Sequence, residues 1–195
     1  MNDAALDAHE HTEHAQHAAH ENNPFISQVS ITIALLAVVA AATASLETYE
    51  SGGAIIEANK AVLLQDQATD QWGYYQAKGI KGDMFDLAAE AGGDKAASYL
   101  KKVKSEAEKQ ERAKAEATKL EKERDEAQAV SAIHERRHHQ LGIAATLLEM
   151  GIAISTIAII TRKRWPWLIS TVLGLAGAAV AGIAYSSLAT MLPGF

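Results

Sequence analysis

The sequence predicts an all-α membrane protein with three transmembrane helices and a long antiparallel helical hairpin, coiled-coil-like, between the first two. Two observations predict this fold. Three apolar segments are each long enough to cross a bilayer, and the region between the first two is charged and divided by a glycine pair. The mean hydropathy of −0.07 and the net charge of −6 average over these apolar and charged blocks.

The first apolar segment comprises residues 24–46 and holds no charged residue. About 20 apolar residues suffice to cross the hydrocarbon core, so this segment predicts the first transmembrane helix. A cleaved signal peptide is excluded because the preceding tail, residues 1–23, holds acidic residues and neither Lys nor Arg.

The second apolar segment is residues 141–161, with Glu149 as its one charge, and the third is residues 165–192, which is uncharged. Each predicts a further transmembrane helix. Between them lies a basic hairpin, residues 162–166, with three positive charges and an interfacial tryptophan, as expected at a membrane surface.

The positive charges also predict the orientation. Basic loops favour the cytoplasmic side, so we expect the N-terminus and the 162–166 hairpin in the cytoplasm and residues 47–140 in the periplasm. Arg136 and Arg137 lie near the membrane on the opposite side and argue against this orientation.

The charged middle region, residues 47–140, predicts the helical hairpin. Its turn is expected at 91–94, because two glycines followed by an aspartate are typical of one helix end and the next helix cap. The arms 25–90 and 95–160 have 66 residues each, or on the order of 100 Å if fully helical. The pair Gly52–Gly53 is a candidate break in the first arm.

A five-residue repeat in the second arm places Glu first and Lys or Arg fourth in each pentad. Side chains three residues apart are neighbours on a helix, and each such ion pair contributes about 0.2–0.5 kcal/mol. The repeat predicts a solvated, self-supporting helix. The pairs are Glu106 with Lys109, Glu111 with Lys114, Glu116 with Lys119, and Glu121 with Arg124.

Trp72, Tyr74 and Tyr75 predict an interaction surface on the first arm. Two helices alone offer little surface to cover three aromatic side chains, and soluble proteins rarely leave such groups together in water. We therefore expect a homo-oligomer, most simply a cyclic one, in which hairpins from other subunits contribute.

The stretch Asp-Gln-Trp-Gly-Tyr-Tyr-Gln-Ala-Lys at residues 70–78 resembles a bacterial membrane-protein family catalogued as domain of unknown function 4337. The basic hairpin, with Arg162, Lys163, Arg164 and Trp165, and the His-rich start are similar to this family too. The resemblance covers nearly the whole chain and implies three transmembrane helices in an inner membrane. It implies no activity and no catalytic residue.

The N-terminal tail is a candidate site for a divalent metal such as Zn²⁺, Ni²⁺ or Cu²⁺, because His-rich tracts are a metal-binding composition. The alternative is a flexible polar tail with adventitious affinity, which such tracts favour because they rarely define one geometry. The histidines are His9, His11, His14, His17 and His20.

A second histidine cluster, His134, His138 and His139, lies just before the second apolar segment. His134 and His138 have a spacing that can bind a metal, but Arg136 and Arg137 repel cations. We therefore expect an interfacial basic cluster that faces lipid phosphates.

Glu149 lies eight residues beyond Leu141, about 12 Å along a helix, and hence inside the hydrocarbon region. The other two spans hold no Lys or Arg to pair with it, so we expect its carboxyl group to be neutral there. Two roles remain open. It either hydrogen-bonds a neighbouring helix and holds subunits together, or it exchanges a proton or binds a cation.

Small residues on the third span predict a helix-packing face, within the chain or between chains, because they let backbones approach closely. They are Gly174, Gly177, Ala178, Ala181 and Gly182.

These features predict a non-enzymatic, oligomeric membrane scaffold or interaction stalk. Its expected partners are the bilayer, further copies of the chain, and another membrane or envelope protein at the hairpin. The alternatives are a proton or cation transport or channel component that uses Glu149, and metal binding by the tail. No other cofactor is expected.

Composition and motifs exclude other classes. The mild acidity argues against nucleic-acid binding, and the lack of cysteine excludes thiolate metal sites and cysteine nucleophiles. The sequence holds no Gly-rich phosphate loop, nucleophile elbow or paired-carboxylate arrangement, so we expect no enzymatic activity.

Overall fold

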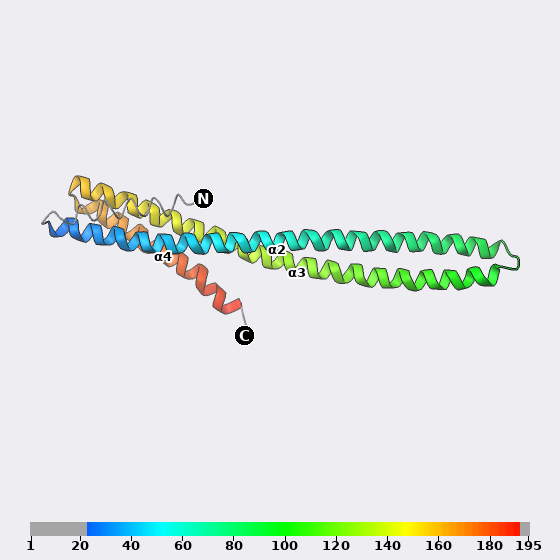
Figure 1. The fold of residues 1–195 in the computed structure, drawn as a ribbon. Coiled ribbons are helices and arrows are strands. Elements are labelled where there is room, and N and C mark those ends of the chain that lie inside the picture. Colours follow the sequence, from blue (N-terminus) through cyan, green and yellow to red (C-terminus); the bar gives the residue numbers. More distant parts are fainter. Residues whose placement is uncertain (1–22, 192–195) are drawn as a thin grey trace. The chain divides into compact units, whose positions relative to one another are not determined.

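The computed structural model describes residues 23–191, with residues 187–191 described by their backbone alone. Three helices, α2 (Pro24–Glu90), α3 (Ala96–Thr161) and α4 (Arg164–Met191), make up nearly all of this part of the chain (Figure 1). The described residues contain no strand. Each helix has a segment long and apolar enough to cross a membrane, as the sequence predicts.

The connections between the helices depend on residues with positive φ. Helix α2 ends at Glu90, and the turn that follows contains Gly92 and Gly93 at φ values of 78° and 97°. Glycine adopts this left-handed region without the steric cost that a side chain brings, so the pair ends the helix. The connection between α3 and α4 is shorter and contains Arg162 at a φ of 53°.

The pair Gly52–Gly53 does not interrupt α2, which corrects one expectation from the sequence. The reason is packing. A Cβ atom on Gly53 would lie 2.9 Å from the ring of His134 on α3. At this position the missing side chain allows a close approach between helices, and that contact offsets the low helix propensity of glycine.

The chain forms two compact units. The three-helix unit contains the described residues up to Gly53 and from Ile133 onward, and the two-helix unit contains Ala54–Ala132.

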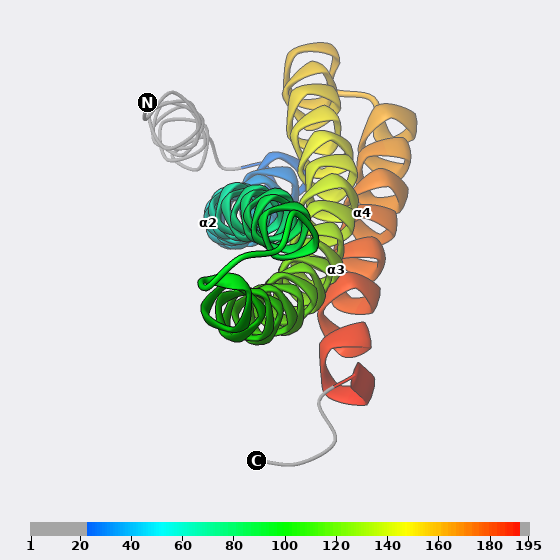
Figure 2. The ribbon, with the colours of Figure 1, turned by 90° about the vertical axis from the view of Figure 1, so that its right-hand side faces the viewer.

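In the three-helix unit, an apolar core joins α2 to α3, and α4 packs beside α3 (Figure 2). Ser155 of α3 and Ser170 of α4, both fully buried, share a hydrogen bond. Trp167 Nε1 of α4 donates to Thr32 Oγ1 of α2 over 3.1 Å. Both bonds satisfy polar atoms that would be costly to bury alone. The core residues are Val29, Ile33, Ala37, Ala40, Leu148, Ile152 and Ala158.

In the two-helix unit, α2 and α3 pack closely along a narrow core made largely of alanine. The Ser131 hydroxyl donates to the Ala54 carbonyl over 2.9 Å, and the rings of Phe85 and Tyr99 stack 6.2 Å apart. Contacts between the helices therefore extend over most of this unit. The core residues are Ala61, Leu64, Ala68, Leu120 and Ala127.

Candidate functional site

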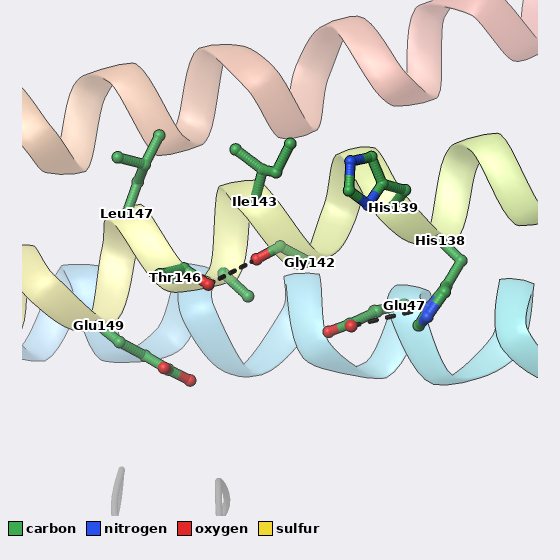
Figure 3. A pocket seen from close by; sticks show the side chains of 9 residues that line it. Glu47, His138, His139, Gly142, Ile143, Thr146, Leu147 and Glu149 are labelled. Atoms are coloured by element: carbon green, nitrogen blue, oxygen red, sulfur yellow. Dashed lines mark hydrogen bonds and ion pairs between the residues drawn. The ribbon is translucent and has the colours of Figure 1, made fainter.

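A groove of about 500 Å³ on α3 of the three-helix unit contains the candidate intramembrane carboxyl group together with other titratable side chains (Figure 3). Glu149 lies at one end, and the pair formed by Glu47 of α2 and His138 of α3 lies at the other. The lining residues are Glu47, His138, His139, Gly142, Ile143, Ala145, Thr146, Leu147 and Glu149.

Helical spacing explains why these residues share a groove. His138, Gly142, Ala145 and Glu149 follow one another at intervals of three or four residues, which places them on one face of α3. Glu149 lies eleven positions after His138, which corresponds to about 16 Å along the axis. Glu47 packs closely against Gly142, where an added Cβ atom would lie 3.1 Å from Glu47 Oε1.

An ion-pair network ties α2 to α3 beside this groove. Glu50 is buried, with 7% of its surface exposed. Its carboxylate lies 2.6 Å from His134 Nδ1 and 3.9 Å from Arg137. A carboxylate this far from water is stable only when such partners surround it. Glu47 and His138 form a looser pair at 3.7 Å.

This network corrects the expectation of a basic cluster that faces lipid phosphates. His134, Arg137 and His138 contact carboxylates of α2. Arg136 and His139, in contrast, are exposed. Nδ1 of His138 is buried without a hydrogen bond, and Glu47 Oε1 lies 3.7 Å from it.

Glu149 itself is exposed on the outer side of α3. Among the described residues, no Lys, Arg or His lies within ion-pair distance of its carboxyl group. Thr146, one turn earlier, donates its hydroxyl hydrogen to the Gly142 carbonyl over 2.9 Å and is therefore engaged with its own helix.

The described residues contain no group of three or more His, Asp or Glu side chains that could hold a metal ion. The five tail histidines, His9, His11, His14, His17 and His20, lie outside the described residues.

The small residues of α4 divide into two sets. Gly174 packs against Leu36 of α2, and a Cβ atom on Gly177 would lie 2.9 Å from both the Ala144 carbonyl oxygen and Leu148 of α3. Ala178 and Gly182 are exposed, and Ala181 is half-buried. The first set therefore packs within the chain, while the exposed set is open to other molecules.

The aromatic side chains of the two-helix unit also differ in exposure. Trp72 Nε1 donates to Glu121 Oε1 of α3 over 2.8 Å, and its ring meets Tyr75 edge-on at 5.5 Å. Both rings are half-buried. Tyr74 is exposed, with Lys78 Nζ 4.6 Å from its ring centre. Tyr74 is therefore the one member of this trio that is open to a partner.

A buried carboxylate, Glu106 of α3, lies next to this aromatic group. The pentad repeat predicts its pair with Lys109 but not its burial or its contacts with Lys78 and Lys81 of α2. Lys109, Lys78 and Lys81 surround it at 2.8, 3.3 and 3.8 Å. The hydrogen bond from Lys109, followed by that from Lys78, holds the pKa of Glu106 below its usual value. Glu106 in turn raises the pKa of Lys78.

The predicted pairs of the pentad repeat form in part. Glu106 pairs with Lys109, and Glu116 lies 3.7 Å from Lys119. Glu121 instead accepts the hydrogen bond from the Trp72 indole. Contacts with α2 therefore compete with the pairs within α3, which a pattern on one helix does not reveal.

A comparison with protein families finds that the model of the family described as "Domain of unknown function (DUF4337)" matches residues 25–187. No curated protein and no solved structure matches the chain.

Proposed function

The chain belongs to the DUF4337 family, and we propose that it is a non-enzymatic, oligomeric membrane scaffold. Residues 54–132, here named the stalk, form an antiparallel, coiled-coil-like helical hairpin that presents an interaction surface to other proteins. Three transmembrane helices anchor the stalk in a bacterial inner membrane.

The observation that carries this proposal is the continuous contact between α2 and α3 in the stalk. Hydrogen bonds, an ion-pair cluster and ring stacking recur from Ala54 with Ser131 to Phe85 with Tyr99. Glu106, buried among three lysines, ties both helices at one level. These contacts stiffen the two-helix unit itself, as a scaffold requires.

The stalk also leaves large aliphatic side chains of α2 exposed. They gather in two clusters, at residues 55–63 and 80–87, and exposed apolar clusters of this kind are typical of a protein–protein contact. A transport role alone does not require such a surface, whereas a scaffold does.

Native mass spectrometry from mild detergent tests this function. We expect an oligomer for the wild type, and we expect it to persist in Glu149→Gln and in Thr118→Asp, which alters an exposed position. Ala117→Asp places a charge at a fully buried position beside Thr118 and should abolish the oligomer. Wild-type monomers at every concentration would overturn the proposal.

The membrane topology has its own test. Reporter fusions after residues 93 and 195 should lie on one side of the membrane, and a fusion before residue 20 on the other. We expect the N-terminus and residues 162–166 in the cytoplasm and residues 47–140 in the periplasm. Reporters at residues 20 and 93 on the same side would contradict three crossings.

The groove supports a second candidate function, proton or cation transport. Glu149, within a candidate membrane span, shares the groove with the Glu47–His138 pair. The groove's volume of about 500 Å³ has room for several water molecules, each about 30 Å³. Protons could pass along water between these groups, since each can accept and release one.

Flux measurements in proteoliposomes separate the two functions. Transport predicts that Glu149→Gln abolishes proton or cation flux while the oligomer persists, and that His138→Gln slows it. His139→Gln is the matched control, because His139 lines the groove but lies apart from Glu47 (Figure 3). Equal flux for wild type and Glu149→Gln would exclude transport through Glu149.

A further inference from the structure

We propose that two copies of this chain pack their stalks against each other in parallel through the face of α2 opposite α3. This inference rests on the scaffold function and names both the surface and the partner. The face is named the outer seam and comprises Ile55, Ile56, Val62, Leu63, Ile80, Met84 and Leu87.

The outer seam is apolar and exposed. Its seven side chains are all aliphatic or methionine, and each exposes between 57% and 67% of its surface. On the same stretch of α2, the residues toward α3 are nearly inaccessible, with Ala61 at 3% and Ala68 at 0%. Helix α2 is therefore apolar on two faces, one of them without cover from the described residues.

The spacing of the outer seam is that of a coiled coil. Ile56, Leu63 and Met84 are separated by multiples of seven residues, so they share position a of a heptad. In the same heptad frame, Ile80 and Leu87 both occupy position d, three residues after a. This spacing places all five on one stripe of the helix.

The inner stripe, with Ala54, Ala61 and Leu64, lies roughly half a turn around the helix from the outer seam. One α3 helix covers the inner stripe. It cannot reach the outer seam of the same α2.

A stripe with this spacing is best covered by another helix whose apolar residues have the same spacing. The outer seam of a second copy meets this requirement. Helix α3 has no comparable apolar stripe, because its exposed positions are mainly charged, among them Lys101, Lys114 and Lys122. The contact is therefore α2 against α2, a self-complementary arrangement that twofold symmetry provides.

The sequence position of the seam favours parallel, in-register packing. In each copy Ile56 lies ten residues beyond Leu46, the end of the first predicted span. Two copies in one membrane therefore present their seams at equal sequence distances from the bilayer. Confinement to the same membrane also raises the effective concentration of each seam for the other.

Two acidic residues divide the seam and disfavour a shift of one heptad. Asp66 and Asp70 are exposed and lie on the same stripe, between the cluster at residues 55–63 and the cluster at residues 80–87. In register, apolar clusters meet apolar clusters. A shift of one heptad places Asp70 of one copy against Leu63 of the other, which buries a charge against an apolar side chain.

The in-register acids repel each other and moderate the association. Asp66→Asn combined with Asp70→Asn should therefore strengthen it, raising the fraction of paired chains several-fold at a fixed concentration. This variant gains rather than loses association, so misfolding cannot imitate the result.

Disulfide cross-linking in native membranes tests the contact directly, because the chain has no cysteine of its own. Single variants Ile56→Cys, Leu63→Cys and Met84→Cys should form cross-linked pairs of twice the chain mass, since facing seam positions of two parallel helices lie within disulfide reach. Matched controls are Ala58→Cys and Asp86→Cys. Both positions are exposed on α2, and each is two residues from a seam variant, Ile56 or Met84, which places it about 160° away around the helix.

We expect at least tenfold more cross-linked pairs from the seam variants than from the controls. Equal yields from seam and control positions would overturn the inference, as would cross-links to a protein of another mass. Native mass spectrometry distinguishes the two levels of proposal. An oligomer without seam cross-links refutes the outer seam alone, whereas a monomer without them refutes the scaffold function as well.

Discussion

Substitution of Gly177 by alanine tests how α4 packs in the three-helix unit. The added Cβ atom would lie 2.9 Å from the Ala144 carbonyl oxygen and 2.9 Å from Leu148 Cγ. The first of these is a backbone atom, so relief requires that α3 and α4 move apart. Such overpacking costs about 1–3 kcal/mol, and the better helix propensity of alanine offsets about 0.5–1 kcal/mol of it.

The matched control is Gly182→Ala on the same helix, where an added Cβ atom has no neighbour within 4 Å. We expect a net loss of about 1–2 kcal/mol for Gly177→Ala, or roughly a 5- to 30-fold lower folding equilibrium constant. Gly182→Ala should be neutral or slightly stabilising.

Thermal unfolding in mild detergent, followed by circular dichroism, measures both variants. The Tm of Gly177→Ala should lie below that of the wild type, and the Tm of Gly182→Ala should not. Equal Tm values for the two variants would refute the close approach of α4 to α3. A lower oligomer mass for Gly182→Leu with unchanged Tm would show that the exposed set of small residues acts between chains.

Three other measurements test separate features. The pKa of Glu106 is lowered by Lys109, so the stabilisation from this carboxylate is present above its ordinary pKa of 4.5 and lost as the pH falls through the lower folded value; thermal melts between pH 7 and pH 3 should show this loss, and Glu106→Gln should remove it. If Glu149 holds helices together, oligomer stability should fall in the order Gln, Leu, Lys at this position, with Leu costing on the order of 1 kcal/mol, and equal stability for Leu and wild type would exclude this role. If the tail binds metal, deletion of residues 1–22 should abolish Zn²⁺ or Ni²⁺ binding in calorimetry, and unchanged binding would refute it.

The sequence predicts the helices themselves well because its signals are local. Apolar runs of about 20 residues, a glycine pair at the turn and a charged repeat each depend on neighbouring residues only. The inner stripe of α2, with Ala61, Leu64 and Ala68, is likewise visible as a spacing on one helix. The structure has these three residues buried against α3.

The partners of charged residues were harder to predict because they lie on different helices. Glu47 and Glu50 were not matched with His138 and His134, although Glu47 and His138 are equally far from the Gly92–Gly93 turn. Their distance from the turn was the signal that could have found them. Register alone does not show that Glu50 is buried, since burial depends on how closely two helices approach.

Within residues 23–191, the amino-acid sequence by itself determined three helices with spans apolar enough for a membrane, a charged region between two of them, and Glu149 inside one span. Those properties follow from hydropathy and helical period along the chain. The tertiary structure decided which face each side chain uses. It buried Gly174 and Gly177 while it left Gly182 exposed, and it turned His134 toward Glu50. These choices depend on how the side chains of packed helices fit together, and no single helix encodes that fit.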